Sequence, residues 1–118
     1  MIKEEKLFTF DVCDGALTVK LVGEIDHHSA VSVRADIDSL IFEKRPKKVV
    51  LDLSEISFMD SSGLGLIMGR YSLVRELGGT LTLRSPTVAV TKILALAGME
   101  RIIKIEKAFE EDDENEEN

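Results

Sequence analysis

Apolar residues recur along this chain with two different spacings. Leu17, Val19 and Leu21 stand at every second position, which is typical of a strand with one buried face. Over residues 29–44 the apolar residues are three or four positions apart, so this segment is predicted to be a helix with one apolar face. The nearly continuous apolar run at 47–54 predicts a buried central strand of the kind found in parallel sheets.

Turn residues mark where several elements end. Asp14 and Gly15 form a dipeptide typical of the turn of a β-hairpin, here between the first two predicted strands. A second helix is predicted to begin near Ser61 and to end at Gly78 and Gly79, because glycine favours the end of a helix. The apolar face of this helix is expected to consist of Leu64, Ile67, Tyr71 and Val74.

The remaining elements complete an α/β pattern. Ser85 and Pro86 are expected to be the N-cap and the first-turn proline of a third helix, which Gly98 ends and a last strand follows. The predicted order is ββαβαβαβ, with an optional short helix from Lys107. Alternating strands and helices predict a largely parallel sheet, and the leading hairpin makes it mixed. We expect one domain over 1–109, with about five strands and three to four helices.

Charge is distributed unevenly along the chain. The formal net charge is −7, and the segment 110–118 holds seven acidic residues and no basic one. The acidic and basic residues of the remaining chain are equal in number, so the body is close to neutral. The acidic tail has too few apolar residues to pack and is expected to be disordered. Because the body offers no obvious basic face, nucleic-acid binding is not expected.

Other classes of protein are also disfavoured. No apolar run is long enough to span a membrane, and residues 1–8 carry acids and lack the apolar segment of a signal peptide. A cytoplasmic location is therefore expected. Cys13 is single, which excludes an internal disulfide and disfavours a metal site.

The segment SFMDSSGLGLIMGRY (57–71) carries the candidate chemistry, because two serines precede three glycines there. Neither serine fits the G-x-S-x-G pattern of a hydrolase nucleophile, since Met59 and Asp60 stand where its first glycine would be. No sequence argument places a histidine beside Ser61. The glycine spacing misses the dinucleotide-binding fingerprint by one residue, and no G-K-[ST] phosphate loop is present.

Two further interpretations of this segment are compatible with each other. In the first, Asp60 or Ser61 caps the helix, and Gly65 and Gly69 let it approach its neighbours closely. In the second, Ser61 is the substrate of another enzyme. The free N–H groups and the dipole of a helix N-terminus tolerate an added phosphate, so the modified chain would stay folded while a docked partner would be repelled.

The motifs themselves resemble a known family. FMDSSGLGLIMGRY (58–71), together with LVGEIDHHSAV (21–31), is similar to the anti-sigma-factor antagonists of the STAS domain family. The resemblance runs over residues 5–108, and the D-S-S-G-L-G signature after a VVLDLS-like strand is fairly specific to STAS domains. The match is nearest to the members that act in sporulation.

The resemblance implies roles for individual residues. Ser61 corresponds to a phosphorylated serine, Asp60 flanks it, and Asp26 corresponds to an acidic residue nearby, in the loop after the second strand. No residue is expected to be catalytic. The residues expected to bind the partner are Asp26, Asp60, Ser61, Gly63, Leu64 and Gly65.

The resemblance also implies a partner, an anti-sigma factor that is at the same time an ATP-dependent serine kinase. The unphosphorylated chain would bind it and release the sigma factor, phosphorylation of Ser61 would end that binding, and a serine phosphatase would restore it. The kinase would hold ATP and Mg²⁺, so the chain itself is expected to be no enzyme, to need no cofactor and to be mostly monomeric when free. The alternatives are a STAS phospho-switch in a stress-response pathway and a nucleotide-binding STAS domain.

Some neighbouring residues have structural interpretations of their own. Asp26 can cap the first helix and still contact a partner, because the two roles are compatible. His27 and His28 are expected to form an exposed polar start to that helix. Arg70 is predicted to be exposed and available to an acidic patch on a partner, whereas Ser62 is expected to turn into its helix.

Overall fold

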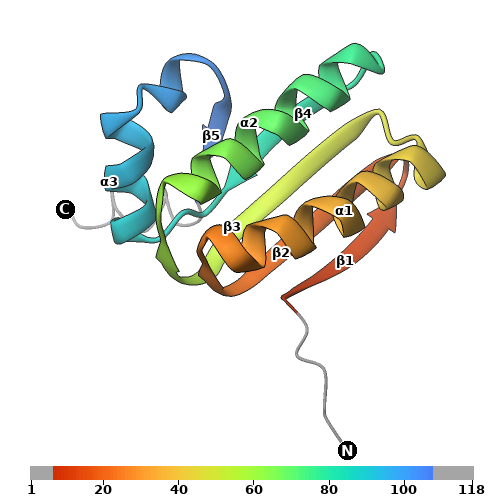
Figure 1. Cartoon of the computed structure of the whole chain (residues 1–118). Helices are drawn as coiled ribbons and strands as arrows, with labels where there is room; N and C mark the ends of the chain where they lie inside the picture. The colour runs from red at the N-terminus through yellow and green to blue at the C-terminus, as the bar shows by residue number, and fades with distance from the viewer. Residues whose placement is uncertain (1–6, 108–118) are drawn as a thin grey trace, which may run out of the picture.

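A five-stranded sheet organises the fold (Figure 1). The computed structural model describes residues 7–107 of the chain. The strands are β1 (Phe8–Cys13), β2 (Ala16–Ile25), β3 (Lys48–Met59), β4 (Thr80–Arg84) and β5 (Lys104–Glu106). The helices are α1 (His27–Lys44), α2 (Ser61–Glu76) and α3 (Val88–Leu96), with a 3₁₀ helix η1 (Met99–Arg101) before β5. The predicted order is confirmed, while the optional helix beyond Lys107 and the tail 110–118 lie outside the described residues.

The sheet is mixed and mostly parallel, as predicted. Its strands are arranged in the order β1-β2-β3-β4-β5, and only the pair β1–β2 is antiparallel. The hairpin that joins this pair turns at Asp14 and Gly15, whose φ angles are 52° and 80°. Two positive φ angles are what a two-residue type I′ turn requires, so the Asp-Gly dipeptide was a correct signal.

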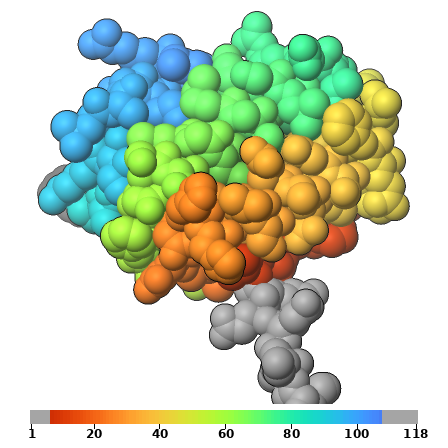
Figure 2. Space-filling view, viewed as in Figure 1, coloured from red at the N-terminus to blue at the C-terminus, as the bar shows by residue number. Residues whose placement is uncertain are grey.

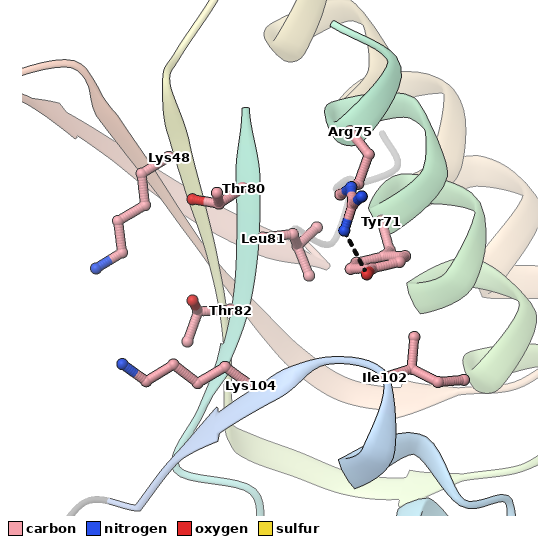
Figure 3. A pocket seen from close by; sticks show the side chains of 8 residues that line it. All are labelled: Lys48, Tyr71, Arg75, Thr80, Leu81, Thr82, Ile102 and Lys104. Carbon is pink, nitrogen blue, oxygen red and sulfur yellow. Dashed lines mark hydrogen bonds between the residues drawn. The ribbon is translucent and has the colours of Figure 1, made fainter. Parts of the chain in front are cut away.

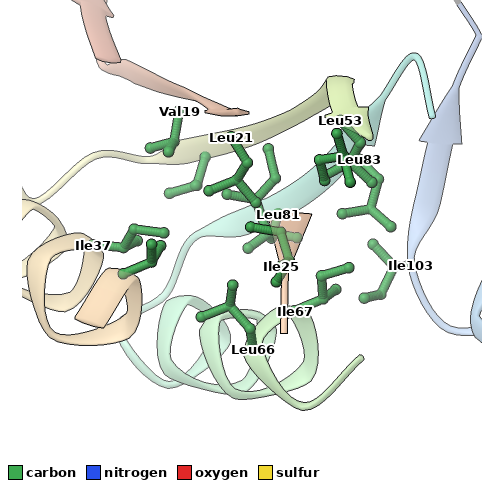
Figure 4. Packing of buried hydrophobic residues seen from close by; sticks show 14 of the residues in the cluster. Val19, Leu21, Ile25, Ile37, Leu53, Leu66, Ile67, Leu81, Leu83 and Ile103 are labelled. Carbon is green, nitrogen blue, oxygen red and sulfur yellow. The ribbon is translucent and has the colours of Figure 1, made fainter. Parts of the chain in front are cut away.

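The apolar core lies between the sheet and the helices. In β2, Leu17, Val19 and Leu21 are buried, whereas the residues between them are half-buried, as the alternation predicts. Helix α1 packs against β2, α2 packs against β3 and β4, and the two helices contact each other. Figure 4 shows the side chains of the sheet meeting Ile37 of α1 and Ile67 of α2.

Strand β3 continues further than the predicted strand at 47–54, to Met59. Beyond Leu53 the buried positions are Ile56 and Met59, three residues apart, and the residues between them are exposed. The pairing of β3 with β2 shifts register in this part, between Lys20 and Val22 and again between Gly23 and Glu24. A bulged strand loses the two-residue alternation, which is why the pattern did not show it.

The start of α3 differs from the prediction. Thr87 is its N-cap, with its Oγ1 accepting a hydrogen bond from the N–H of Val90 at 3.2 Å. Ser85 is not the cap; its N–H donates to the carbonyl of Glu106 at 2.7 Å and so continues the pairing of β4 with β5. The predicted last strand is the short β5, which follows η1.

The prediction that Arg70 is exposed is wrong. Its side chain lies between α2 and α1, and only 6% of the residue is exposed. The Nε atom lies 2.8 Å from Oδ1 of Asp38 in α1, and Nη1 donates to the carbonyl of Leu66 at 3.2 Å. Neither Nε nor Oδ1 makes a well-directed hydrogen bond, whereas Nη2 donates to Oδ2 of Asp38 at 3.5 Å, so charge and this one hydrogen bond join the pair. Burial lowers the pKa of Arg70, and the negative charge of Asp38 opposes that effect.

This ion pair also explains how the apolar face of α2 differs from the prediction. Ile67 and Val74 are buried as expected, whereas Leu64 and Tyr71 are only half-buried. Leu66 is buried as well, on the side of the helix that Arg70 shares. The hydrophobic pattern predicted that the position of Arg70 faces solvent. The residue can be buried there because Asp38 neutralises its guanidinium group.

We expect Asp38→Ala to lower the free energy of unfolding by about 1–2 kcal/mol, because it leaves the guanidinium of Arg70 buried without a counter-charge. The loss stays below that of a fully buried pair, since the side chain of Asp38 is 29% exposed and water screens the pair. Urea denaturation measures the change. Asp36→Ala, at an exposed position of the same helix, is the matched control and should change the stability by less than about 0.5 kcal/mol. Equal losses in the two variants would contradict a stabilising pair.

Candidate functional site

The candidate site lies where β2 and β3 end and the two following helices begin. The last residues of these strands, Ile25 and Met59, are partners in the parallel pairing. The N–H of Asp60 then donates to the carbonyl of Ile25 at 3.2 Å. Asp26 and Asp60 therefore follow adjacent strand ends, and the N-termini of α1 and α2 lie next to each other. Figure 2 shows the orange start of α1 beside the yellow-green start of α2 on the surface.

Asp26 caps α1 through a reciprocal pair of hydrogen bonds. Its Oδ1 accepts from the N–H of Ser29 at 2.9 Å, and the Oγ of Ser29 accepts from the N–H of Asp26 at 3.0 Å. This arrangement is a capping box, with serine at the position where glutamate is commoner. The hydrogen bond from Ser29 N–H is the main reason that the pKa of Asp26 lies below its ordinary value. The structural interpretation of Asp26 is thus confirmed.

Asp60 caps α2 through a single hydrogen bond, without the reciprocal bond found at Asp26. Its Oδ1 accepts from the N–H of Ser62 at 2.8 Å. Of the two candidates for this cap, the structure selects Asp60, so Ser61 is the first residue of the helix. Ser61 is exposed, and within residues 7–107 its hydroxyl makes no hydrogen bond. The cap therefore leaves this hydroxyl available to an incoming molecule.

Ser62 has different surroundings from Ser61. It is half-buried and borders a groove of about 270 Å³ between α1 and α2. The groove is also lined by His27, Ala30, Val31, Arg34, Gly65 and Leu66. The expectation that Ser62 turns inward agrees with this position. His27 and His28 are exposed as predicted, and neither makes a hydrogen bond to Ser61.

The glycines of α2 occupy different kinds of position. Gly63 is buried, and a Cβ atom there would collide with the side chain of Met59. At Gly65 and Gly69, by contrast, a Cβ atom would meet nothing within 4 Å. The prediction that this second pair allows close approach to neighbours within the chain is therefore wrong. Leu64 is half-buried and packs against the core, so Gly65 is the more open of the expected partner-binding positions around it.

A second hollow of about 410 Å³ lies at the opposite ends of β3 and β4, near their first residues (Figure 3). In it the Nη1 of Arg75 donates to the hydroxyl of Tyr71 at 3.0 Å, with the guanidinium over the ring. The other residues that line it are Lys48, Thr80, Leu81, Thr82, Ile102 and Lys104. None of the predicted site residues belongs to this hollow.

The described part of the chain contains no cluster of three or more histidine, cysteine, aspartate or glutamate residues that could hold a metal ion. None of the helices in residues 7–107 is both long enough and apolar enough to cross a membrane. Among the described residues the candidate site presents two helix N-termini, two capping carboxylates and one serine hydroxyl that makes no hydrogen bond.

This combination of fold and site defines a family. The sequence model of the STAS domain family matches residues 8–112, so the chain belongs to this family. Within it, an anti-sigma F factor antagonist of Paenibacillus polymyxa is 40% identical over 91 residues, which cover 77% of this chain and 78% of the relative. An anti-sigma-B factor antagonist of Bacillus subtilis (strain 168) is 30% identical over 89 residues, with 75% and 80% covered.

Solved structures of anti-sigma factor antagonists are also similar to this chain. The anti-sigma factor antagonist SpoIIAA in its unphosphorylated form is 28% identical, with a TM-score of 0.74 over 92% of this chain and 94% of that one. The Bacillus cell fate determinant SpoIIAA in its phosphorylated form is 29% identical, with a TM-score of 0.67 over 92% and 96%. The shared fold therefore occurs in a protein that exists in both states.

The cap at Asp26 predicts a specific pH dependence. Because the pKa of Asp26 is lower in the folded chain than in the unfolded chain, its ionised form stabilises the fold above the ordinary aspartate pKa. That contribution is lost as the pH falls through the lowered pKa. Asp26→Asn keeps the oxygen acceptor without the charge, so its stability should fall less than that of the wild type between about pH 6 and about pH 3.

Urea denaturation at several pH values measures this difference. Asp36→Asn, at an exposed position of the same helix, is the control and should follow the wild type. Identical pH profiles for Asp26→Asn and the wild type would show that the carboxylate contributes nothing beyond its oxygen.

Proposed function

We propose that this chain is an anti-sigma-factor antagonist whose binding to its partner is switched off by phosphorylation of Ser61. The proposal rests mainly on the different roles of Asp60 and Ser61 at the start of α2. Asp60 supplies the cap, and Ser61 keeps an exposed hydroxyl without a hydrogen bond among the described residues. The 40% identity to an anti-sigma F factor antagonist and the two forms in which SpoIIAA has been solved support it.

The surroundings of the two serines favour Ser61 over Ser62 as the modified residue. A kinase must bring the hydroxyl oxygen into line with the γ-phosphate of ATP, which requires open space around it. Ser61 is exposed, whereas Ser62 is half-buried and its N–H is bound by Asp60. Phosphorylation of Ser61 therefore needs no rearrangement of the groove between α1 and α2.

A phosphate on Ser61 would change the surface more than the fold. It adds a charge of about −1.5 to −2 at the N-terminus of a 16-residue helix, where the dipole and the free N–H groups favour negative charge. The same charge would stand next to Asp60 and near the strand end that carries Asp26. A partner that fits the neutral hydroxyl would then face a concentrated negative charge, which weakens binding.

The partner in this proposal is an anti-sigma factor that is also a serine kinase and holds ATP and Mg²⁺ itself. The chain acts as ligand and substrate, has no catalytic residue and needs no cofactor, and a serine phosphatase restores the binding form. We place it in sporulation, because the anti-sigma F relative is 40% identical and the anti-sigma-B relative 30%. A stress-response switch is the second candidate, on the strength of that anti-sigma-B relative.

The test is phosphorylation and binding with the anti-sigma factor kinase from the same genome. We expect Ser61→Ala to bind the kinase and to resist phosphorylation, as seen by mass spectrometry of the 49–70 peptide. Ser61→Asp should bind at least about tenfold more weakly, which corresponds to ~1.4 kcal/mol or more of binding free energy. Ser62→Ala is the matched control and should be phosphorylated and bound like the wild type. Unimpaired binding of Ser61→Asp would contradict the switch, and micromolar binding of ATP or GTP by the isolated chain would favour a nucleotide-binding STAS domain.

Gly65 offers a second test of the binding surface. Because a Cβ atom there meets nothing within 4 Å among the described residues, Gly65→Gln should raise the free energy of unfolding by about 0.5–1 kcal/mol through better helix propensity. The same side chain would collide with a kinase docked on α2, so binding should weaken at least about tenfold. Calorimetric titration measures the binding, and thermal unfolding measures the stability.

Gly69→Gln is the matched control for this test. It lies one helical turn further from Ser61, and a Cβ atom there also meets nothing within 4 Å, so it should gain similar stability. We expect it to bind the kinase like the wild type. If both variants bind the kinase equally weakly, the contact surface extends along the helix. If Gly65→Gln binds like the wild type, Gly65 is not part of the contact surface.

A further inference from the structure

The outer edge of β1 is an unpaired strand edge that the proposed function does not use. β1 is the first strand in the sheet order, and within residues 7–107 no strand pairs with its outer side. The carbonyl of Leu7 accepts from Val22 of β2, so the odd-numbered residues of this segment direct their backbone groups inward. The N–H and C=O groups of Phe8, Phe10 and Val12 therefore point outward.

This edge lacks the features that usually protect a strand from pairing. β1 has six residues in continuous register with β2, and it contains no lysine, no proline and no bulge. The opposite edge of the sheet, β5, has only three residues, and its ends are Lys104 and Glu106. The two edges thus differ in length and in charge, and β1 is the one suited to accept another strand.

The side chains of β1 add an apolar surface to the edge. Phe10 is opposite Val19 and Val12 is opposite Leu17, so both point to the side of the sheet that carries the buried core. Even so, Phe10 is 50% exposed and Val12 is 43% exposed. Figure 2 shows β1, in red, at the border of the molecule below α1.

We propose that β1 pairs antiparallel with β1 of a second copy of this chain, in a register centred on Phe10. In this register Phe8 is opposite Val12 of the other copy, so every outward N–H and C=O group of the three even-numbered residues finds a partner. Asp11 is then opposite Thr9, and a hydroxyl can donate to its carboxylate. A register centred on Asp11 would instead place two carboxylates directly opposite each other, which is unfavourable.

A second copy is the occupant that fits the edge best, because the strand is complementary to itself in this register. The single charge of the strand meets a hydrogen-bond donor, and the exposed Phe10 side chains meet across the two-fold axis. The axis is perpendicular to the sheet, so the helices of both copies lie on the same side and the sheet becomes ten-stranded. The two Ser61 sites then lie at opposite ends of the strands, and both remain open to a partner. This inference goes beyond the proposed function and replaces the expectation of a mostly monomeric free chain.

Sedimentation equilibrium on the full chain tests the proposal, over concentrations from about 10 µM to about 1 mM, where weak dimers dissociate and form. The average mass of the wild type should rise with concentration towards twice that of one chain. Phe10→Lys places charges opposite each other at the two-fold axis, and Val12→Pro removes an outward N–H without touching the pairing with β2. Each should shift the dimer to at least about tenfold higher concentration. Phe58→Lys, at an equally exposed phenylalanine of β3, is the control and should dimerise like the wild type.

Circular dichroism and thermal unfolding establish that each variant is folded, and two different substitutions keep the test independent of any one of them. A wild-type chain that stays monomeric up to about 1 mM overturns the proposal. So does a dimer that Phe10→Lys and a folded Val12→Pro leave unchanged, because its interface would lie elsewhere.

Single cysteines test the register. In a Cys13→Ser background, residue 10 is the position that meets its own counterpart at about 5.5 Å between Cα atoms, a distance a disulfide can bridge. Phe10→Cys should therefore form a disulfide-linked dimer faster than Thr9→Cys or Asp11→Cys. Faster cross-linking of Asp11→Cys or Thr9→Cys would overturn the register centred on Phe10.

Discussion

The parallel pairing of β2 with β3 is the constraint on which the candidate site depends. The pairing brings Ile25 and Met59 side by side, and the hydrogen bond from Asp60 N–H to the carbonyl of Ile25 extends it by one residue. Because each strand is followed at once by a helix, the ends of the two strands fix the starts of the two helices. Two N-termini with their positive dipole ends then meet on one surface, each capped by an aspartate. The serine stands where these features converge, so its environment is set by the sheet.

The sequence predicted the parts of this arrangement that depend on local geometry. The Asp-Gly hairpin, the capping by Asp26 and the order of the elements are properties of short segments, and each has a recognisable pattern. In the DSSG segment the sequence left open whether Asp60 or Ser61 caps the helix, and only the structure assigns the cap to Asp60.

The remaining features could not be predicted because they depend on contacts between distant segments. Arg70 is buried only because Asp38, on another helix, neutralises it. The extra length of β3 depends on its pairing with β2 through a shifted register, which removes the alternation from its own sequence. Thr87, and not Ser85, caps α3, and the N–H of Ser85 instead continues the pairing of β4 with Glu106 in β5. The open space around Gly65 could not be predicted either, because a glycine in the sequence does not indicate whether its surroundings are crowded or open.

The glycines of α2 also determine how easily the helix opens. Each glycine in a helix interior costs roughly 1 kcal/mol relative to alanine, and Gly65 and Gly69 recover none of it through contacts within the described chain. The first nine residues of α2 hold three glycines, whereas the last seven, which include Tyr71 and Val74, hold none, so helix propensity stabilises the first part less. Ser61 lies in the part that helix propensity stabilises less. Because Leu66 and Ile67 belong to the core, a local change that presents Ser61 to another enzyme would be confined to the first turn of the helix.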